Sequence, residues 1–385
     1  MKIEDLKSTI VGVPYTEPEP WAWGVGHYGV NSILVELSTD EGITGIGEGT
    51  TFHSEIECGK LITDSARKFL VGEDPFDIER IMRRLWGAGF TDHQVMAGIE
   101  MALWDAMGKA CRKPLYKLLG GAYNKEIPFA AWINRKKPHD MARDAIDFAK
   151  QGFHAFNIKV GIDAIEDIEA VKSVREAVGD KCEIRVDANM AWAPNVAIKM
   201  IKKFERYDIA FAEDPTYSRA MGRVMKAVDT PICSGASTVQ AISRVIVDGS
   251  ADIIGHIDPK LQGGIMNSKK ACVMSEMACL PVVLHAGSEL GISNNAMLHI
   301  VASTPNFLFP NQTYYMYLAD DVCKGGLQRF QNGCMKVPEG PGLGAEIDRD
   351  KVEKYSQRHK QQGGFSIYEE HESKGMKKIL PHQAY

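Results

Sequence analysis

The 385-residue chain lacks the features that mark membrane and secreted proteins. It contains no long uncharged apolar run, so no segment predicts a membrane-spanning helix. Its start, residues 1–7, alternates charged and apolar residues and lacks the apolar core of a signal peptide. The eight cysteines are scattered, and none belongs to a CxxC pair or to a dense disulfide framework. We therefore predict reduced thiols and a cytoplasmic protein.

The chain also lacks a strong excess of charge of either sign. Its 45 basic and 50 acidic residues give a net charge of -5, which argues against nucleic acid or an anionic membrane as a partner. A hydrophobic content of 44% and a charged content of 25% are ordinary for a globular protein. They exclude extensive disorder, collagen and coiled coil.

The first third of the sequence predicts an α+β domain. Residues 30–37 alternate as a strand, and a turn with glycine leads into a return strand over 43–47. Helical periodicity follows over 58–70 and again, strongly, over 96–110. We place the end of this domain after a Gly-Gly pair and assign it residues 1–124.

A strand–helix repeat fills the middle of the chain. Eight short apolar runs, spaced 22 to 28 residues apart, are followed by helix-like stretches. Eight such units close a parallel (β/α) barrel, which we predict over 125–324, with an open doubly wound sheet as the alternative. Residues 325–385 show little periodicity, and we expect them to return to the first domain and complete it. The predicted strands end at Asn134, Lys159, Asp187, Glu213, Ala236, Asp258, His285 and Asn311.

Two acidic residues end neighbouring strands of the predicted barrel, at the mouth where barrel enzymes carry their active sites. Asp187 and Glu213 would repel each other unless a cation lies between them. Carboxylate oxygens suit Mg²⁺, which needs one or two of them beside water and substrate oxygens. The alternative is a carboxylate pair bridged by an arginine such as Arg185.

Two basic residues end strands on opposite sides of the same mouth. Lys159 ends the second strand, His285 ends the seventh, and Asp258 on the sixth can orient the imidazole. With a substrate carboxylate near the metal, such groups flank the α-carbon and exchange its proton. Loss of a β-hydroxyl or re-protonation with inversion can follow.

Several motifs resemble those of the enolase superfamily, in its mandelate racemase/muconate lactonizing branch. They are GIGE, AGIEMALWDAMGKACRKPLYKLLGG, NIKVG, VDANMAW, FAEDP, DPKLQGG and HAGSELGIS. FAEDP, DANMAW, HxxSxLGIS and VPEGPGLG are most similar to the glucarate dehydratase side. The resemblance implies an α+β capping domain built from both termini, a TIM-like barrel, Mg²⁺ and a homo-oligomer. It also implies a His285–Asp258 dyad facing Lys159, and it disfavours cycloisomerase chemistry, for which a lysine would replace Asp258.

One departure concerns the metal. The family's third ligand falls at Ala236, whose methyl group cannot bind a cation. Asp187 and Glu213 would then hold Mg²⁺ more weakly, helped by substrate oxygens. Asp214 should face away unless the chain turns there, and Ser234, Ser237 or water are candidates to fill the gap.

Other departures concern the bases. The usual paired lysines of the second strand are Asn157 and Lys159, and the eighth strand ends at Asn311 without the glutamate of the racemases. We expect Asn157 and Asn189 to contact substrate, with a turn-forming asparagine as the equal alternative for Asn189. Trp21 and His27, in a segment rich in Pro and Gly, are expected to belong to a lid over the mouth, with packing inside the cap as the alternative.

These observations predict a Mg²⁺-dependent dehydratase of an acid sugar or related polyhydroxy carboxylate. The first alternative is a racemase or epimerase of an α-substituted carboxylate, which needs a base on each face of the substrate. The second alternative is a metal-poor, non-catalytic relative, for which Ala236 and Asn157 are the evidence.

Overall fold

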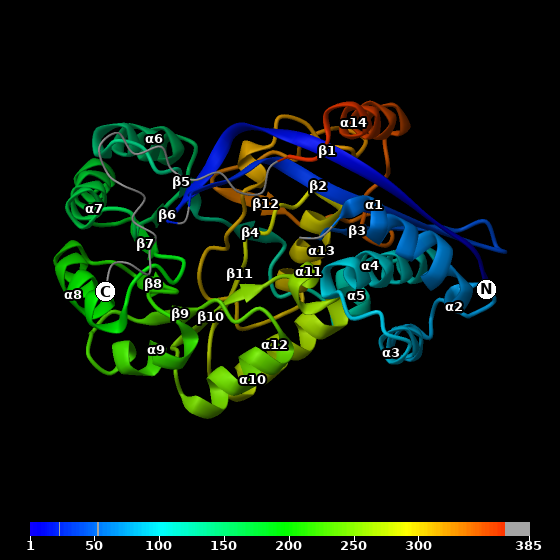
Figure 1. The fold of residues 1–385 in the computed structure, drawn as a ribbon, viewed down its shortest axis with the longest axis horizontal. Helices are drawn as coiled ribbons and strands as arrows, with labels where there is room; N and C mark the ends of the chain where they lie inside the picture. The colour runs from blue at the N-terminus through cyan, green and yellow to red at the C-terminus, as the bar shows by residue number, and fades with distance from the viewer. Residues whose placement is uncertain (23, 52–53, 366–385) are drawn as a thin grey trace.

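The computed structural model describes residues 1–22, 24–51 and 54–365, with the backbone alone at 25–27. The described residues form a capping domain beside a barrel of parallel strands (Figure 1). Within the described part of the chain, no helix is long and apolar enough to cross a membrane.

A three-stranded antiparallel sheet and a layer of helices form the cap. The sheet order is β1 (Ile3–Trp21), β2 (Gly24–Thr39) and β3 (Thr44–Gly49). The predicted hairpin is confirmed, because β2 pairs with β3 across the turn. The helical elements are α1 (Glu55–Lys60), η1 (Leu61–Ala66), α2 (Arg67–Leu70), α3 (Ile78–Gly87), α4 (His93–Ala110) and α5 (Leu115–Leu118).

The GIGE motif lets β3 lie directly on α4. A Cβ atom at Gly45 would collide with the carbonyl oxygen of Ala102, and one at Gly47 with that of Gly98. On the same helix, Asp105 accepts hydrogen bonds from the amides of Ile46 (2.9 Å) and Leu343 (2.8 Å). The motif therefore fixes how the sheet and the helix of the cap pack together.

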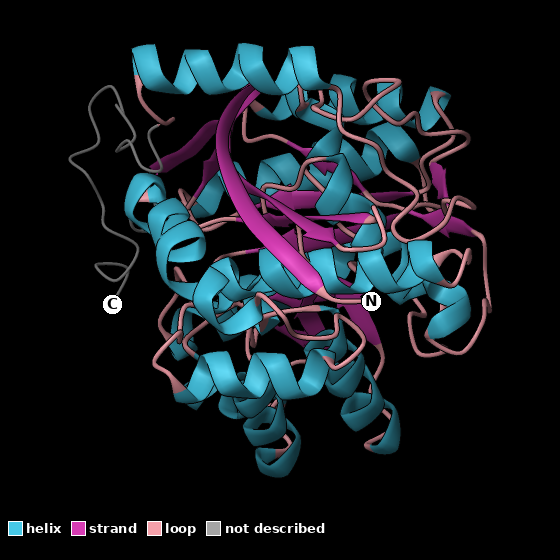
Figure 2. Cartoon of the chain, turned by 90° about the vertical axis from the view of Figure 1, so that its right-hand side faces the viewer, coloured by secondary structure: helices cyan, strands magenta, loops and turns pink. Residues whose placement is uncertain are grey.

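The segment expected to form a lid loop is an extension of two strands. β1 continues to Trp21 and β2 begins at Gly24, so Trp21 ends a strand and the backbone of His27 lies within one. The structure tolerates prolines in β1 because β1 is an edge strand, and register shifts follow Pro14 and Glu19. Figure 2 shows β1 running as a long, twisted strand from the N-terminus.

Seven parallel strands form the barrel, in the order β11-β10-β9-β8-β7-β6-β5, with helices outside them (Figure 1). The strands are β5 (Ala131–Ile133), β6 (Ala155–Lys159), β7 (Glu183–Asp187), β8 (Phe211–Glu213), β9 (Ile232–Ser234), β10 (Ile253–Ile257) and β11 (Val282–Leu284). The helices are α6 (Pro138–Lys150), α7 (Ala164–Val178), α8 (Pro194–Phe204), η2 (Glu205–Tyr207), α9 (Ser218–Met225), α10 (Val239–Asp248), α11 (Pro259–Gln262), α12 (Ile265–Met277) and α13 (Gly291–Ala302).

The predicted eighth strand is not a regular strand. Residues 306–311 fill the gap between β11 and β5 through a few backbone contacts. Val282 donates to the Asn306 carbonyl (2.9 Å), and Asn311 forms a single parallel bridge with Phe129. Pro310 has no N–H to donate, which prevents a continuous ladder here.

The carboxyl-terminal part returns to the rest of the fold. After η3 (Tyr315–Tyr317), β12 (Cys334–Lys336) pairs antiparallel with β4 (Glu126–Pro128). The last helix, α14 (Arg349–Gln362), packs against β1. This helix was not predicted, because only a few of its residues are apolar and its buried face is narrow.

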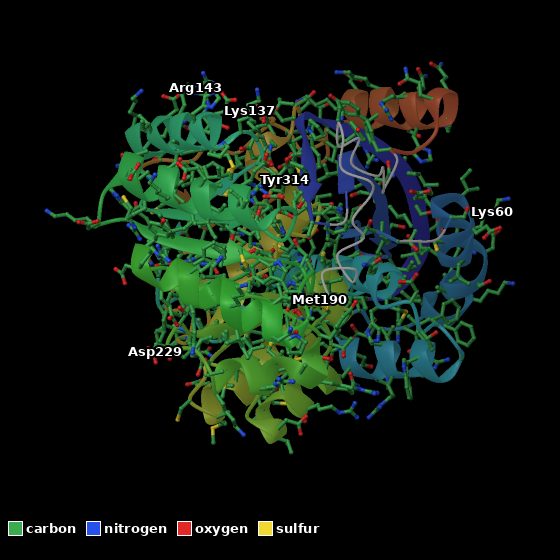
Figure 3. All side chains as sticks on the ribbon, turned by 60° about the vertical axis from the view of Figure 1, so that its left-hand side comes forward. Lys60, Lys137, Arg143, Met190, Asp229 and Tyr314 are labelled. Atoms are coloured by element: carbon green, nitrogen blue, oxygen red, sulfur yellow. The ribbon has the colours of Figure 1, made fainter. Side chains whose placement is uncertain are left out.

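The hairpin of β1 and β2 is attached to the barrel near its tip. The Tyr314 hydroxyl lies 3.0 Å from Asn134 Oδ1 of the barrel and 3.1 Å from the Pro18 carbonyl of β1. Figure 3 shows Tyr314 beside the blue amino-terminal strands. The cap is thereby held over the carboxyl ends of the barrel strands.

Candidate active site

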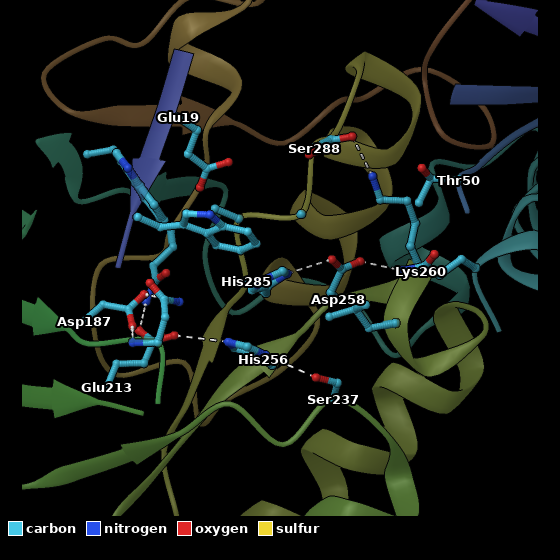
Figure 4. A pocket seen from close by; sticks show the side chains of 18 of the residues that line it. Glu19, Thr50, Asp187, Glu213, Ser237, His256, Asp258, Lys260, His285 and Ser288 are labelled. Carbon is cyan, nitrogen blue, oxygen red and sulfur yellow. Dashed lines mark hydrogen bonds and ion pairs between the residues drawn. The ribbon is translucent and has the colours of Figure 1, made fainter. Parts of the chain in front are cut away.

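A cavity of about 260 Å³ lies between the barrel mouth and the cap (Figure 4). Residues of β6, β7, β8 and the loops after β10 and β11 line its floor, while Glu19, Trp21 and Thr50 belong to the cap. Five residues that the sequence singled out meet here, although they are far apart in the chain: Lys159, Asp187, Glu213, Asp258 and His285.

Lys159 and Asp187 form a buried ion pair on one side of the cavity. The Lys159 ammonium lies 2.5 Å from Asp187 Oδ2 and 3.0 Å from Asn189 Oδ1. It also lies 4.4 Å from the centre of the Trp132 ring, on the neighbouring strand. Burial alone would lower the pKa of Lys159, but the charges of Asp187 and Glu19 outweigh burial and raise it. Lys159 is therefore a protonated ammonium at neutral pH.

Glu213 has two hydrogen-bond donors of its own. His256 Nε2 lies 3.2 Å from Glu213 Oε1, and Gln312 Nε2 donates to the other carboxylate oxygen. Burial would raise the pKa of Glu213, but the hydrogen bond and charge of His256 lower it below its usual value. Glu213 is therefore a carboxylate next to a cationic imidazole.

Arg185 does not bridge the two carboxylates. Its guanidinium pairs with Glu183 and donates to the Pro310 carbonyl (2.6 Å). It also lies 4.7 Å from the centre of the Phe211 ring. These partners hold Arg185 away from the mouth, so the alternative of an arginine bridge is wrong.

Among the described residues, no three His, Cys, Asp or Glu side chains converge as metal ligands, so none of these residue types replaces the third ligand that the resemblance places at Ala236. The chain does turn at Asp214 (φ 40°), but the Asp214 carboxylate accepts from the Gly235 amide (2.7 Å). Asp187 and Glu213 remain as register partners on β7 and β8, both buried and both facing the cavity. This donor set fits Mg²⁺ only when substrate and water complete the shell.

His285 and Asp258 form the expected dyad. His285 Nδ1 lies 3.1 Å from Asp258 Oδ2. Since an ionised carboxylate only accepts, Nδ1 carries the proton and Nε2 keeps its lone pair for the cavity. The other oxygen of Asp258 caps α11 by accepting from the Lys260 amide (2.8 Å), which holds the carboxylate in place. Burial would raise the pKa of Asp258, but His285 and Lys260 lower it.

A second imidazole, His256, lies against the dyad. Its ring centre is 4.1 Å from that of His285. Ser237 Oγ lies 3.2 Å from His256 Nδ1 and donates to the Gly235 carbonyl (3.0 Å). Because the Ser237 hydroxyl gives its proton to the Gly235 carbonyl, it can only accept from His256 Nδ1. His256 Nε2 donates to Glu213, so both ring nitrogens carry protons and the ring is cationic. Burial and this neighbouring charge lower the pKa of His285, which keeps it neutral as a base requires.

The remaining predicted residues lie at different distances from the cavity. Trp21 and Asn189 line it. Asn157 is buried one step deeper on β6, outside the wall, and neither of its amide atoms has a hydrogen-bond partner among the described residues. The side chain of His27 lies outside the part that the structure describes.

Three titratable lining residues, His256, Lys260 and Glu19, were not predicted from the sequence. His256 lies two residues before Asp258 on the same strand, so the period of two placed it on the interior face. Lys260 follows Asp258 in DPKLQGG. Glu19, whose pKa burial raises to about 7, comes from the cap, and nothing in its neighbourhood in the sequence connects it to the barrel.

Comparison with known proteins identifies the family. Residues 140–351 match the model for the enolase C-terminal domain-like family, and residues 8–120 match that of the mandelate racemase/muconate lactonizing enzyme N-terminal domain. The chain is 30% identical over 357 residues to an L-Ala-D/L-Glu epimerase of Bacillus subtilis, covering 89% of this chain and 96% of that protein. It is 28% identical over 347 residues to an arabinonate dehydratase of Saccharolobus solfataricus, covering 86% and 92%.

The solved structures agree in fold. An enolase of Thermobispora bispora, crystallised with magnesium and formate, superposes with a TM-score of 0.87 at 26% identity, covering 95% of this chain and 96% of that one. Both curated relatives catalyse reactions of small molecules, one an epimerisation and one a dehydration. The two-part architecture and both family models together show that the chain belongs to the mandelate racemase/muconate lactonizing branch of the enolase superfamily.

Proposed function

We propose that this protein is a dehydratase of a polyhydroxy carboxylate, with His285 as its acid and base. The observation that carries the proposal is that the two candidate bases, Lys159 and His285, differ in protonation state. Lys159 donates hydrogen bonds to Asp187 and Asn189 and has no lone pair to offer, whereas His285 is neutral and presents Nε2 to the cavity. Dehydration needs one base, whereas racemisation needs two, one on each face of the α-carbon of the substrate.

The residues would act in a simple sequence. His285 Nε2 removes the α-proton of the bound carboxylate, and the electron pair moves into the carboxylate to give an enediolate. Its collapse expels the β-hydroxyl, which takes the proton from His285 and leaves as water. The enol product then tautomerises to a 2-keto-3-deoxy acid, and His285 is neutral again.

The cations of the site would stabilise the charge that develops on the substrate. Lys159 and His256 supply fixed positive charge beside Asp187 and Glu213. Asp187 and Glu213 would hold Mg²⁺, which in this family of enzymes supplies a further positive charge next to the substrate carboxylate.

The test is incubation with a library of aldonates and aldarates at saturating Mg²⁺, with detection of keto acid. Turnover of one member, lost by at least about 10³-fold in both His285→Asn and Asp258→Asn, supports the proposal. As a matched control, His154→Asn changes an exposed histidine and should leave turnover unchanged. Absence of keto acid with every member would overturn dehydration.

The second candidate is racemisation or epimerisation, which the retained Lys159 and the epimerase relatives favour. Solvent deuterium at the α-carbon without keto acid would select it. In that case His285→Asn should abolish exchange from one stereoisomer only. Neither exchange nor keto acid with any member would point to the non-catalytic relative.

A further inference from the structure

The proposed reaction uses one side of the cavity, and a buried lysine on the opposite side has no part in it. Figure 4 shows Asp187 and Glu213 on one side, His285 in the middle and Lys260 beyond it. Lys260 lines the cavity although its side chain is only 1% exposed. A buried ammonium needs oxygen partners, so the hydrogen bonds of Lys260 show what it can bind.

The ammonium of Lys260 makes fewer hydrogen bonds than it can. It donates to the Ser288 carbonyl (2.8 Å), and its nearest carboxylate, Glu48 Oε1, is 3.8 Å away, beyond hydrogen-bond length. An ammonium has three donors. Among the described residues, Lys260 therefore keeps donor capacity toward the cavity.

Glu48 has hydrogen-bond donors other than Lys260, although burial raises the pKa of Glu48 and the charge of Lys260 acts against burial to lower it. Its carboxylate accepts from the amides of Leu290 and Ser293, both 2.9 Å away, and from the Ser32 hydroxyl at 3.1 Å. Those two amides belong to the start of α13, where a helix favours negative charge. Glu48 therefore takes up no hydrogen-bond donor of Lys260, and the donors that the Ser288 carbonyl leaves over can serve a ligand.

The position of Lys260 is fixed by the catalytic machinery itself. Its amide donates to Asp258 Oδ1 (2.8 Å), and the other oxygen of that carboxylate orients His285. Lys260 is the second residue of the one-turn helix α11, which Asp258 caps, so covalent geometry keeps it close to the dyad. Thr50 and Gln94 of the cap line the cavity with it and add polar groups for a ligand.

We propose that Lys260 binds a second anionic group at the far end of the substrate, so that the preferred substrates are dicarboxylic acid sugars, acids oxidised at both ends. This proposal rests on the proposed function for the placement of the first carboxylate beside Asp187 and Glu213. The reacting α-carbon then lies over His285, and the chain of hydroxyl-bearing carbons extends toward Lys260.

Binding measurements test this independently of turnover. Pairs of acids with the same carbon number and configuration, such as glucarate and gluconate, would be titrated calorimetrically into the magnesium-loaded protein. We expect the dicarboxylate of at least one pair to bind about 10-fold more tightly or better. Lys260→Met should remove this preference by weakening the dicarboxylate about 10- to 100-fold, with the monocarboxylate changed less than about threefold.

Lys269→Met is the matched control. Lys269 is a partly buried lysine that, like the buried Lys260, donates to a serine carbonyl, that of Ser303 (2.6 Å), but it lies outside the cavity. Lys269→Met should leave the affinities for the dicarboxylate and the monocarboxylate unchanged. Lys260→Arg should keep part of the preference for the dicarboxylate, because arginine keeps the positive charge. No preference for any dicarboxylate in the wild-type protein, or equal losses for both acids in Lys260→Met, would overturn the proposal.

The outcome is separable from that of the proposed function. Preferential binding that Lys260→Met removes, without keto acid from any member, would support the role of Lys260 and refute dehydration. Dehydration of monocarboxylates in preference to dicarboxylates would support the proposed function and refute the role of Lys260.

Discussion

At the residue scale, the charge on His256 decides which group in the cavity can act as a base. The imidazolium of His256 lies against the His285 ring and donates to Glu213. His256 therefore favours the neutral form of His285 and the ionised form of Glu213. Side chains with perturbed pKa values cluster at functional sites, because catalysis requires each acid or base to be in a particular protonation state.

The lowered pKa of His285 predicts the pH dependence of turnover. A general base acts when deprotonated, so kcat/KM should be maximal above about pH 6.5 and should fall about tenfold per pH unit below the pKa of His285. His256→Phe removes the neighbouring cation and should move this acid limb to higher pH. Rate profiles from pH 4.5 to 8 check both statements, and an unmoved limb in His256→Phe would mean that burial alone sets the pKa.

Position 236 predicts the behaviour of the metal. With two carboxylates, Mg²⁺ should bind weakly alone and more tightly when an acid-sugar ligand completes its shell. Ala236→Glu adds a third anionic oxygen and should tighten binding about tenfold or more. Calorimetric titration of Mg²⁺ into both proteins, with and without ligand, measures this. Equal affinities would show that another group already takes the third place.

Residues at strand ends were accessible to sequence reasoning, because the repeat fixes where each strand stops. Lys159, Asp187, Glu213 and His285 follow from that alone, and Asp258 also marks the start of a one-turn helix. Glu19 was not accessible, since its place in the cavity depends on the docking of the cap, which no local pattern encodes.

At the element scale, α4 and α12 are joined by one buried carboxylate. Glu100 of α4 accepts from the amides of Ile265 (2.7 Å) and Met266 (2.9 Å), at the first turn of α12. It also accepts from the Trp104 indole (2.8 Å). A helix of the cap thus supplies the amino-terminal cap of a barrel helix.

Replacing this carboxylate should be costly. Glu100→Leu leaves two buried helix amides without an acceptor, and we expect a loss of about 3 kcal/mol in the free energy of unfolding. Glu79→Leu is the control, because Glu79 also reaches α12, through an exposed ion pair with Lys270, and should change stability by about 0.5 kcal/mol or less. Urea denaturation compares the two, and similar losses would contradict the argument.

Elements with strong periodicity were predictable and those held by tertiary contacts were not. The helix over 93–110 and most barrel strands were found from their patterns. The long strand β1 was not predicted, because its prolines argue against a strand. It is an edge strand whose only partner strand is β2 among the described residues, and an edge tolerates proline. Residues 306–311 are apolar like a strand, but Pro310 interrupts the ladder they were expected to form.

At the scale of the whole molecule, a buried neutral histidine predicts how stability responds to acid. His299 of α13 is fully buried, accepts from the Tyr116 amide (3.3 Å), and has a pKa lowered by burial to about 4. A lowered histidine pKa means that the folded state prefers the neutral ring. Its contribution is complete above pH 6.5 and is lost as the pH falls toward 4.

The expected loss is about 2 kcal/mol between pH 7 and pH 5. His299→Gln keeps an acceptor for the Tyr116 amide but cannot titrate, so its stability should change less over the same range. Unfolding temperatures of the two proteins across this range measure the difference. Parallel pH curves would show that His299 does not titrate on unfolding.

The assembly of the two domains was predicted from the family resemblance and not from any pattern in the chain. The homo-oligomer rests on the same resemblance and stays a prediction. Within one chain, β12 pairs with β4, α14 packs on β1, and Phe365 donates to Asn31 Oδ1 (3.0 Å). These contacts join residues hundreds of positions apart, which periodicity cannot reveal.

The position of α14 on β1 has a consequence for synthesis on the ribosome. β1 precedes α14 in the chain, so β1 leaves the exit tunnel first and stays uncovered until residues 349–362 have followed. Until then its apolar face is open to chaperones or to another nascent chain, and contacts of such long sequence separation form slowly. The cap, which supplies Glu19 and Thr50 to the cavity, is therefore completed only after α14 has been synthesised.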